Sequence, residues 1–115
     1  MAIMVEELRN MDFSDVKDKG RLKPTHPGII LKKIINELGI SEYRLAKEIS
    51  VPARRINEII HGKRSITADT AVRLSRAFNT TVRFWLNLQS AYDAEIAERR
   101  LSKILSDIPL LAATA

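Results

Sequence analysis

Residues 41–66, SEYRLAKEISVPARRINEIIHGKRSI, constrain the fold of this chain more than any other stretch, because they predict two short helices with almost nothing between them. The first helix is expected over Glu42–Ile49, where apolar residues recur on one face. The second is expected to open at Pro52 and to end before Gly62, since proline suits a first helical turn and glycine suits the residue past a helix end. Because only residues 50–51 link them, the helices are expected to cross sharply instead of stacking antiparallel.

The second helix has two faces of different chemistry. Val51, Ile56 and Ile59 are expected to close a small core shared with the first helix. Arginine and asparagine make bidentate contacts with guanine and adenine edges, and small residues at a helix start leave room for entry into a groove. The pattern predicts a helix that enters the major groove of DNA, and the alternative is an αα-corner with a solvated basic face. The candidate base-reading residues are Pro52, Ala53, Arg54, Arg55, Asn57 and Glu58.

The chemistry of each candidate suggests a role. Arg54 is the first choice for a base contact, while Ala53 suits a thymine methyl group and Glu58 suits a cytosine amine. Arg55 suits either a base or a phosphate. Other groups around the helix pair are better placed for the DNA backbone. The candidate phosphate contacts are Ser41, Glu42, Arg44, Lys47, His61, Lys63 and Arg64.

Composition agrees with this prediction and narrows the class of protein. The chain has 115 residues, which suits one domain, and its net charge of +5 favours a polyanionic partner. It has no cysteine, no apolar run of membrane-spanning length and no signal-peptide pattern, so we expect a soluble, cytoplasmic protein. The two histidines, His26 and His61, lie on separate predicted elements, with no nucleophile pairing or metal-ligand spacing. We therefore expect no enzymatic activity, no cofactor or metal, no membrane association and no small-molecule ligand.

The rest of the sequence predicts an all-α, five-helix domain with an extended C-terminal helix. A helix over Pro27–Leu38 precedes the central pair. A helix capped by Thr67 follows it and ends near Phe78, with Arg73 and Arg76 on its exposed face. The expected divisions are residues 1–23, a segment that either frays or orders on a partner, residues 24–82, the DNA-binding domain, and residues 83–115, for core closure and dimerisation.

An apolar stripe runs along residues 82–108, the last predicted helix. The spacing predicts one continuous helix that Pro109 stops. So long a stripe exceeds what a small domain buries, which favours dimerisation; the alternative is a helix that bends back over the domain. The Trp85 and Tyr92 rings are expected in the core or at a dimer seam, as opposed to a ligand cage. The candidate seam residues are Trp85, Leu88, Tyr92 and Ile96.

Three short motifs stand at fixed places around the helix pair. HPG stands at the start of the helix expected over Pro27–Leu38, NEIIHGKR at the end of the second helix of the pair, and WLNLQ followed by YD in the last helix. Through them, residues 24–93 resemble the HigA-type antitoxins of bacterial addiction modules, a branch of the phage-repressor-like XRE helix-turn-helix family. Three positions depart from the family pattern. Ile29 stands where glutamate is more frequent, and Ser50 and Asn79 stand where glycine is common.

The resemblance implies two partners. Antitoxins of this type bind a small basic ribonuclease toxin, usually a ribosome-dependent one, and they repress their own operon by binding double-stranded operator DNA as homodimers. A stand-alone helix-turn-helix repressor without a toxin is the alternative, with identical DNA chemistry. A protein-interaction module that binds no DNA is a third class, and a gel shift with upstream DNA separates it from the other two.

Overall fold

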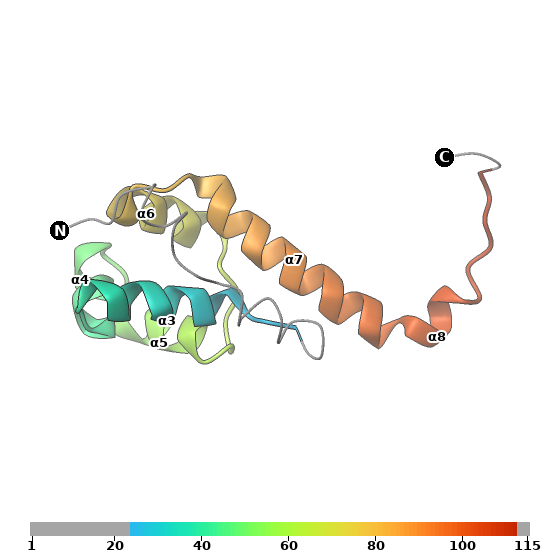
Figure 1. Ribbon diagram of the computed structural model, residues 1–115, viewed down its shortest axis with the longest axis horizontal. Coiled ribbons are helices and arrows are strands. Elements are labelled where there is room, and N and C mark those ends of the chain that lie inside the picture. Colours follow the sequence, from blue (N-terminus) through green and yellow to red (C-terminus); the bar gives the residue numbers. More distant parts are fainter. Residues whose placement is uncertain (1–23, 113–115) are drawn as a thin grey trace.

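Six helices form the fold of residues 24–112, the part of the chain that this computed structural model describes, and no strand occurs there. The all-α prediction is thereby confirmed, while the expectations for residues 1–23 lie outside the described residues. Figure 1 shows the order of the helices along the chain. They are α3 (Pro27–Leu38), α4 (Glu42–Glu48), α5 (Ala53–Ile60), α6 (Ala68–Phe78), α7 (Val82–Arg100) and α8 (Ser102–Leu105).

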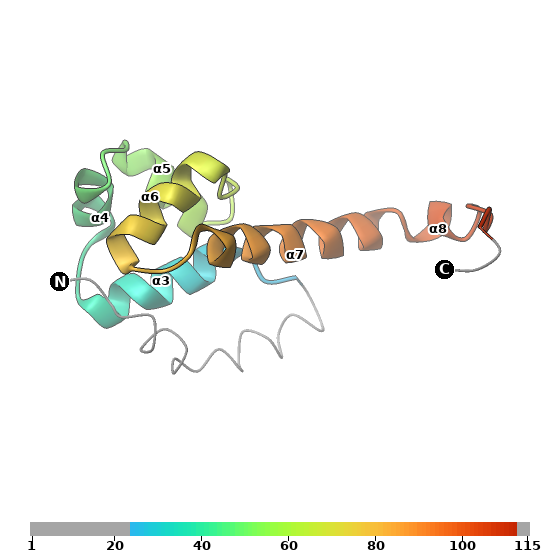
Figure 2. The same ribbon diagram turned by 90° about the horizontal axis from the view of Figure 1, so that it is seen from above.

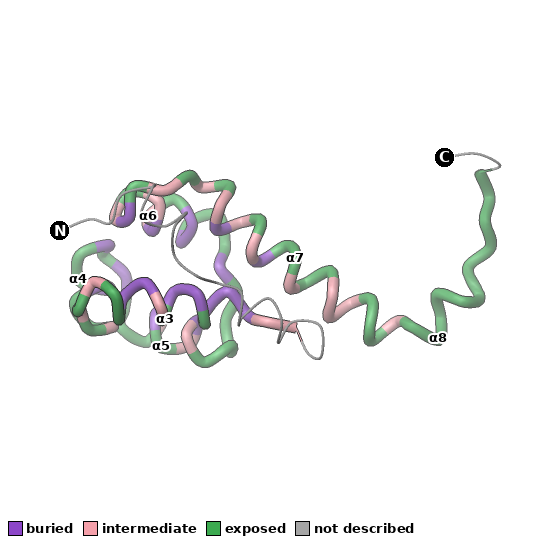
Figure 3. Tube along the Cα trace, viewed as in Figure 1, coloured by how far each residue is buried: buried purple, intermediate pink, exposed green. Residues whose placement is uncertain are grey.

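One hydrophobic core lies among α3, α4, α5, α6 and the start of α7. The close pairs are α4 with α5, α6 with α7, and α3 with both α5 and α7. Buried positions gather in this part of the molecule and are absent from the described chain beyond α7 (Figure 3). The large, fully buried hydrophobic side chains of the core are Leu31, Ile34, Ile35, Leu45, Ile56, Ile59, Ile66, Leu74, Phe78 and Trp85.

Capping residues account for several helix ends. The Ser41 hydroxyl accepts the Arg44 backbone N–H at 2.9 Å, which satisfies one orphan donor at the start of α4. Gly39, with φ 70°, and Asn79, with φ 56°, both end their helices in the left-handed conformation. Thr67 occupies the N-cap of α6, as expected, but its side chain makes no capping hydrogen bond.

Gly28 permits a close approach between two helices of the core. A Cβ atom at this position would lie 1.9 Å from the carbonyl oxygen of Ile59. Only a residue without a side chain therefore allows α3 to contact the backbone of α5 at this depth. This contact fixes the end of α5 against the first turn of α3.

The last predicted helix differs from the expectation because it is interrupted. Helix α7 ends at Arg100, Leu101 has φ −96° and ψ 8°, and the one-turn helix α8 follows. The alternative, a helix that bends back over the domain, does not occur, because α7 projects away from the other helices in both views (Figures 1 and 2). No helix in residues 24–112 has both the length and the apolar character that a membrane span needs.

We call residues 101–112 the C-terminal arm. Its side chains are exposed apart from half-buried Leu101. The large aliphatic groups there are exposed, and they are Ile104, Leu105, Ile108, Leu110 and Leu111.

Candidate nucleic-acid interface

A tight turn sets the angle between α4 and α5. Ile49 is the C-cap of α4 instead of its last helical residue, and Ser50 takes φ 59°, a left-handed conformation that favours glycine. The Val51 N–H donates to the Ala46 carbonyl at 3.0 Å, and the small Ala46 side chain is buried between the helices. The link is longer than predicted, because residues 49–52 all lie outside the helices.

Pro52 is the N-cap of α5 and not its first helical residue, which corrects the predicted start. Its ψ of 142° is extended, so the helix begins at Ala53. The Pro52 carbonyl still accepts the Arg55 N–H at 3.0 Å. An extended proline at this position costs no helical hydrogen bond, because it has no N–H to lose. Its side chain and that of Ala53 are exposed at the tip of the helix.

The two faces of α5 differ as the sequence predicts. Ile56 and Ile59 are fully buried against the core. Arg54 and Asn57 are exposed on the opposite face, and 84% of the Arg54 side chain is open to solvent. The helix therefore presents its polar face outward while aliphatic contacts hold it to the domain.

Glu58 joins two arginines on this outer face. Its Oε2 accepts from Nε of Arg54 at 3.0 Å. Its Oε1 accepts from Nε of Arg64 at 2.9 Å and lies 2.8 Å from Nη2 of the same guanidinium. The hydrogen bond from Arg64, followed by the one from Arg54, holds the pKa of Glu58 below its ordinary value.

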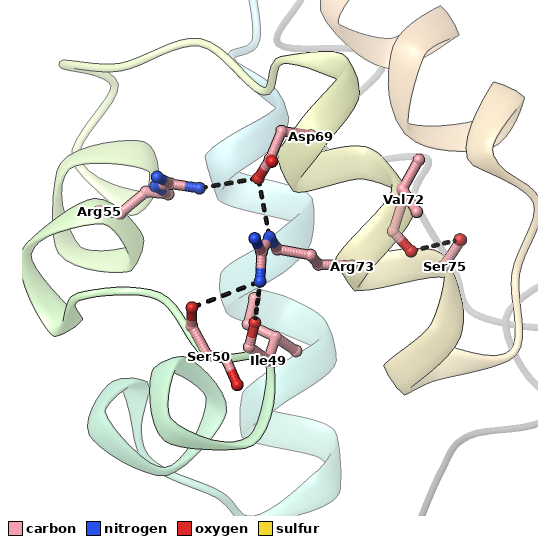
Figure 4. Close-up of polar contacts among 7 residues, drawn as sticks. All are labelled: Ile49, Ser50, Arg55, Asp69, Val72, Arg73 and Ser75. Carbon is pink, nitrogen blue, oxygen red and sulfur yellow. Dashed lines mark hydrogen bonds and ion pairs between the residues drawn. The ribbon is translucent and has the colours of Figure 1, made fainter.

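A second ion-pair cluster ties α5 and the turn to α6, and Figure 4 shows its members. Asp69 Oδ1 accepts from Arg55 Nη1 at 3.0 Å and from Arg73 Nε at 2.7 Å. Arg73 Nη1 donates to the carbonyls of Ile49 at 2.8 Å and Ser50 at 3.3 Å. The guanidinium of Arg73 therefore caps the end of α4. The hydrogen bond from Arg73 is also the main cause that lowers the pKa of Asp69.

Glu42 forms the third such contact, between α4 and its neighbours. It accepts from the Asn57 side-chain amide at 3.0 Å and from Lys32 Nζ at 3.4 Å. Asn57 is therefore exposed but oriented by α4.

The other candidate phosphate contacts lie on the surface around α4 and α5. Lys47 and Lys63 are exposed, and Arg44 is exposed with Glu48 at 3.9 Å. The His61 ring nitrogen Nδ1 lies 2.8 Å from the Asn57 carbonyl, at the end of α5. Ser41 uses its hydroxyl as a cap, and Arg64 is held by Glu58.

Trp85 is a core residue and not an exposed seam. It is fully buried, its ring meets Phe84 and Phe78, and its Nε1 donates to the Thr80 hydroxyl at 2.9 Å. Leu88, Tyr92 and Ile96 are half-buried along the same helix. The Tyr92 ring contacts His26 edge-on at 4.9 Å between centroids.

Four positioning residues were not predicted from the sequence. Arg73 was expected to be exposed but reaches the turn, and Asp69 was not expected to bind Arg55. His26 is buried and caps α3 by accepting the Gly28 N–H at 2.9 Å. Gln89, within WLNLQ, is buried, accepts the Ile66 N–H at 2.8 Å and donates to Asp93 at 2.9 Å. The only signal for Gln89 was an amide on an otherwise apolar helix face.

No cluster of three or more histidine, cysteine, aspartate or glutamate side chains suited to a metal ion occurs within residues 24–112. Within the same range, every buried side-chain nitrogen and oxygen has a hydrogen-bond partner.

Comparison with known proteins identifies the family. The helix-turn-helix family profile matches residues 31–85. Virulence-associated protein I of Dichelobacter nodosus is 44% identical over 93 residues, which span 80% of this chain and 86% of the relative. An addiction module antidote protein of the HigA family from Coxiella burnetii is 43% identical with a TM-score of 0.74, over 77% of this chain and 98% of that one.

A third similar protein was solved on DNA. The antitoxin HigA of Pseudomonas aeruginosa, in a structure with the higBA promoter, is 39% identical with a TM-score of 0.75. The match covers 78% of this chain and all of the relative. The motifs, the fold and these matches agree, and the chain belongs to the HigA family of helix-turn-helix antitoxins.

Proposed function

We propose that this protein represses its own operon by placing α5 in the major groove of operator DNA, and that it neutralises a toxin as a separate task. The observation that carries the DNA-binding part is the division of α5 into a fully buried aliphatic face and an exposed face with Arg54 and Asn57. The similar antitoxin from Pseudomonas aeruginosa, solved with the higBA promoter, supports the same use of this fold.

Base contacts come from the tip and outer face of α5. Arg54 is suited to guanine O6 and N7, Asn57 to adenine, and Ala53 to a thymine methyl group. For Asn57 to reach a base, its amide must leave Glu42, which now accepts from it at 3.0 Å. Lys63, Arg44 and Lys47 are exposed around the helix pair and suit phosphate contacts, which add affinity without adding sequence preference.

Footprinting and salt titration of two variants test this division. Arg54→Ala is expected to lose about 1–3 kcal/mol of operator binding and to relax sequence preference. Lys63→Ala is expected to weaken binding to all sequences alike and to lower the salt slope by about one unit. Arg100→Ala, at the end of α7, is the matched loss of charge away from α5. Wild-type operator affinity in both Arg54→Ala and Lys63→Ala would refute the proposed orientation.

Two subunits are proposed to bind as a pair, with one α5 in each of two successive major grooves about 34 Å apart on an inverted repeat. The exposed aliphatic groups of the C-terminal arm support a subunit contact, because monomers rarely expose so many together. Light scattering of the full chain should give twice the chain mass of 13.0 kDa. Ile104→Asp should halve the measured mass, and the control Ser102→Asp should leave it unchanged. An unchanged mass for Ile104→Asp would exclude the arm as the subunit contact.

Toxin neutralisation is proposed from family membership. A small basic ribonuclease encoded beside this chain should co-purify with it and lose its ribonuclease activity in the complex. If the neighbouring gene product neither binds nor is inhibited while operator binding is intact, the protein is a stand-alone repressor.

A further inference from the structure

We propose that Glu58 is a specificity-determining residue of the α5 surface, which orients Arg54 toward guanine and discourages its contact with phosphate. The proposal deepens the proposed DNA-binding function and rests on it. It assigns Glu58 a positioning role, in place of a direct contact with cytosine. Arg64 becomes the residue that holds Glu58, in addition to any phosphate contact it makes.

The three side chains form a directional chain of contacts. Arg64 grips one carboxylate oxygen of Glu58 with two nitrogens, at 2.9 and 2.8 Å. Among residues 24–112, the other oxygen accepts from Nε of Arg54 alone, at 3.0 Å. Arg64 lies beyond the end of α5, while Arg54 lies one turn before Glu58 on the same helix. Arg64 therefore positions the Glu58 carboxylate, and the carboxylate in turn positions the Arg54 guanidinium.

The choice of nitrogen leaves Arg54 free for a bidentate contact. A guanidinium bound through Nε still has both terminal nitrogens for another acceptor pair. Guanine offers O6 and N7 at a spacing that matches this fork. Arg54 remains 84% exposed despite the ion pair, so the fork is open to solvent.

Arg55, the neighbouring arginine, shows the contrasting arrangement. It contacts Asp69 through the terminal nitrogen Nη1, and its side chain is 28% exposed. One terminal nitrogen of its fork is therefore already engaged within the protein, and its side chain is less exposed than that of Arg54. Of the two α5 arginines, Arg54 is the one prepared for a base.

The charge of Glu58 gives it a second effect on selectivity. Its carboxylate is ionised at neutral pH, since its two arginine partners lower its pKa. An ionised carboxylate beside Arg54 repels phosphate, which is the main contact that non-specific DNA offers. A guanine edge satisfies Arg54 without bringing a phosphate to that position. Glu58 therefore penalises non-specific complexes more than the operator complex.

The test compares operator and scrambled duplexes in equilibrium titrations with wild type, Glu58→Gln and Glu48→Gln. Glu48 is the matched control, because it pairs with Arg44 on α4 at 3.9 Å and makes no contact with Arg54. Glu58→Gln is expected to lower the operator-to-scrambled affinity ratio about tenfold, mainly by tightening scrambled binding. Glu48→Gln should leave the ratio unchanged. Thermal unfolding by circular dichroism verifies that both variants are folded.

Two further measurements isolate Arg54. In an Arg54→Ala background, Glu58→Gln should no longer change the ratio. Each operator guanine is then replaced in turn by 7-deazaguanine, which lacks the N7 acceptor. The replacement should weaken operator binding by the wild type at one position per half-site, and it should weaken binding by Glu58→Gln less at that position.

The outcomes separate the possible failures. If Glu58→Gln raises the affinity for both duplexes by the same factor, the residue acts only through net charge and the proposal is overturned. If its effect persists without Arg54, Glu58 contacts the DNA itself and the proposal is overturned. A wild-type protein with no preference for the operator would instead refute the proposed function.

Discussion

The domain of residues 24–100 and the C-terminal arm contain similar aliphatic side chains in opposite environments. Ile56 and Ile59 of the domain are fully buried, while Ile104 and Ile108 of the arm are 57% and 60% exposed. The difference lies in the neighbours, since α3 and α4 pack against α5 whereas nothing in the described chain covers the arm. Hydrophobic residues in the domain therefore stabilise the fold, and those in the arm are available for a partner.

The largest expected effect tests this difference directly. Ile59→Ala should lower the free energy of unfolding by about 2–5 kcal/mol, because it leaves a cavity among fully buried neighbours. Ile108→Ala should change it by less than about 0.5 kcal/mol, as at other exposed positions. Urea titration followed by the fluorescence of buried Trp85 measures both. A similar loss in the two variants would mean that the arm is part of the core.

Gly28→Ala sharpens the comparison at the close contact between α3 and α5. Alanine usually stabilises a helix relative to glycine, but here its Cβ would meet the Ile59 carbonyl at 1.9 Å. We expect a loss of roughly 3 kcal/mol, since α3 must move away from α5. Gly39→Ala is the control for backbone strain alone. Gly39 has φ 70° and no atom near a new Cβ, so its substitution should lower the free energy of unfolding by about 1 kcal/mol in the same urea titration.

Arg73→Met tests the polar support of the turn. Methionine keeps much of the aliphatic stem but removes the bonds to Asp69 and to the carbonyls of Ile49 and Ser50. We expect the free energy of unfolding to fall by about 1.5–3 kcal/mol, the range for a hydrogen bond that involves a charged group. Arg76→Met, exposed on the same helix, should be nearly neutral. Equal effects of the two substitutions would show that the turn does not depend on Arg73.

The smallest expected effect is a pH dependence from His26. Burial, the main cause, lowers the pKa of His26 below its ordinary 6.5, against the charge of Asp93 and a hydrogen bond to the backbone of Arg64. The unfolded chain then binds the proton first, so stability is constant above about pH 6.5 and falls as the pH drops toward the lowered pKa. Protonation at Nδ1 would also oppose the Gly28 N–H that this atom accepts.

His26→Asn should flatten the pH dependence in that window, because asparagine caps a helix without titrating. Thermal unfolding at intervals from pH 7.5 to about pH 5 measures the difference. The lowered pKa values of Glu58 and Asp69 act in a separate window. Their contribution is present above the ordinary pKa of a carboxyl and is lost as the pH falls below it. A slope near pH 6 that is identical in both proteins would exclude His26 as its source.

Local chemistry explains what the sequence predicted of the fold. Caps and left-handed residues act within a few positions of the chain, so Ser41, Gly39 and Asn79 set helix ends locally, and Thr67 was correctly predicted at the start of α6. Periodicity also identified the buried face of α5, where Ile56 and Ile59 lie. The break at Leu101 was missed, since the apolar spacing continues past it while the helical backbone does not.

Ion-pair partners across the fold were beyond this kind of prediction. Periodicity tells which face of a helix a side chain occupies, but not what another helix brings to that face. Asp69 lies 14 positions after Arg55, and Arg73 lies 24 after Ile49. Both contacts arise only when α6 packs beside the turn. Exposure of the α5 tip was predictable, whereas the orientation of its arginines was not.

The unbroken helix α7 runs from the hydrophobic core to the arm and sets the distance between them. Its 19 residues span about 28 Å at 1.5 Å per residue. Adding one residue near its end would rotate everything after it by about 100°. A molecule bound to the arm would therefore have a set orientation about the α7 axis relative to Arg54. A change of helical phase would alter that orientation even if the contacts of the arm and of Arg54 were all kept.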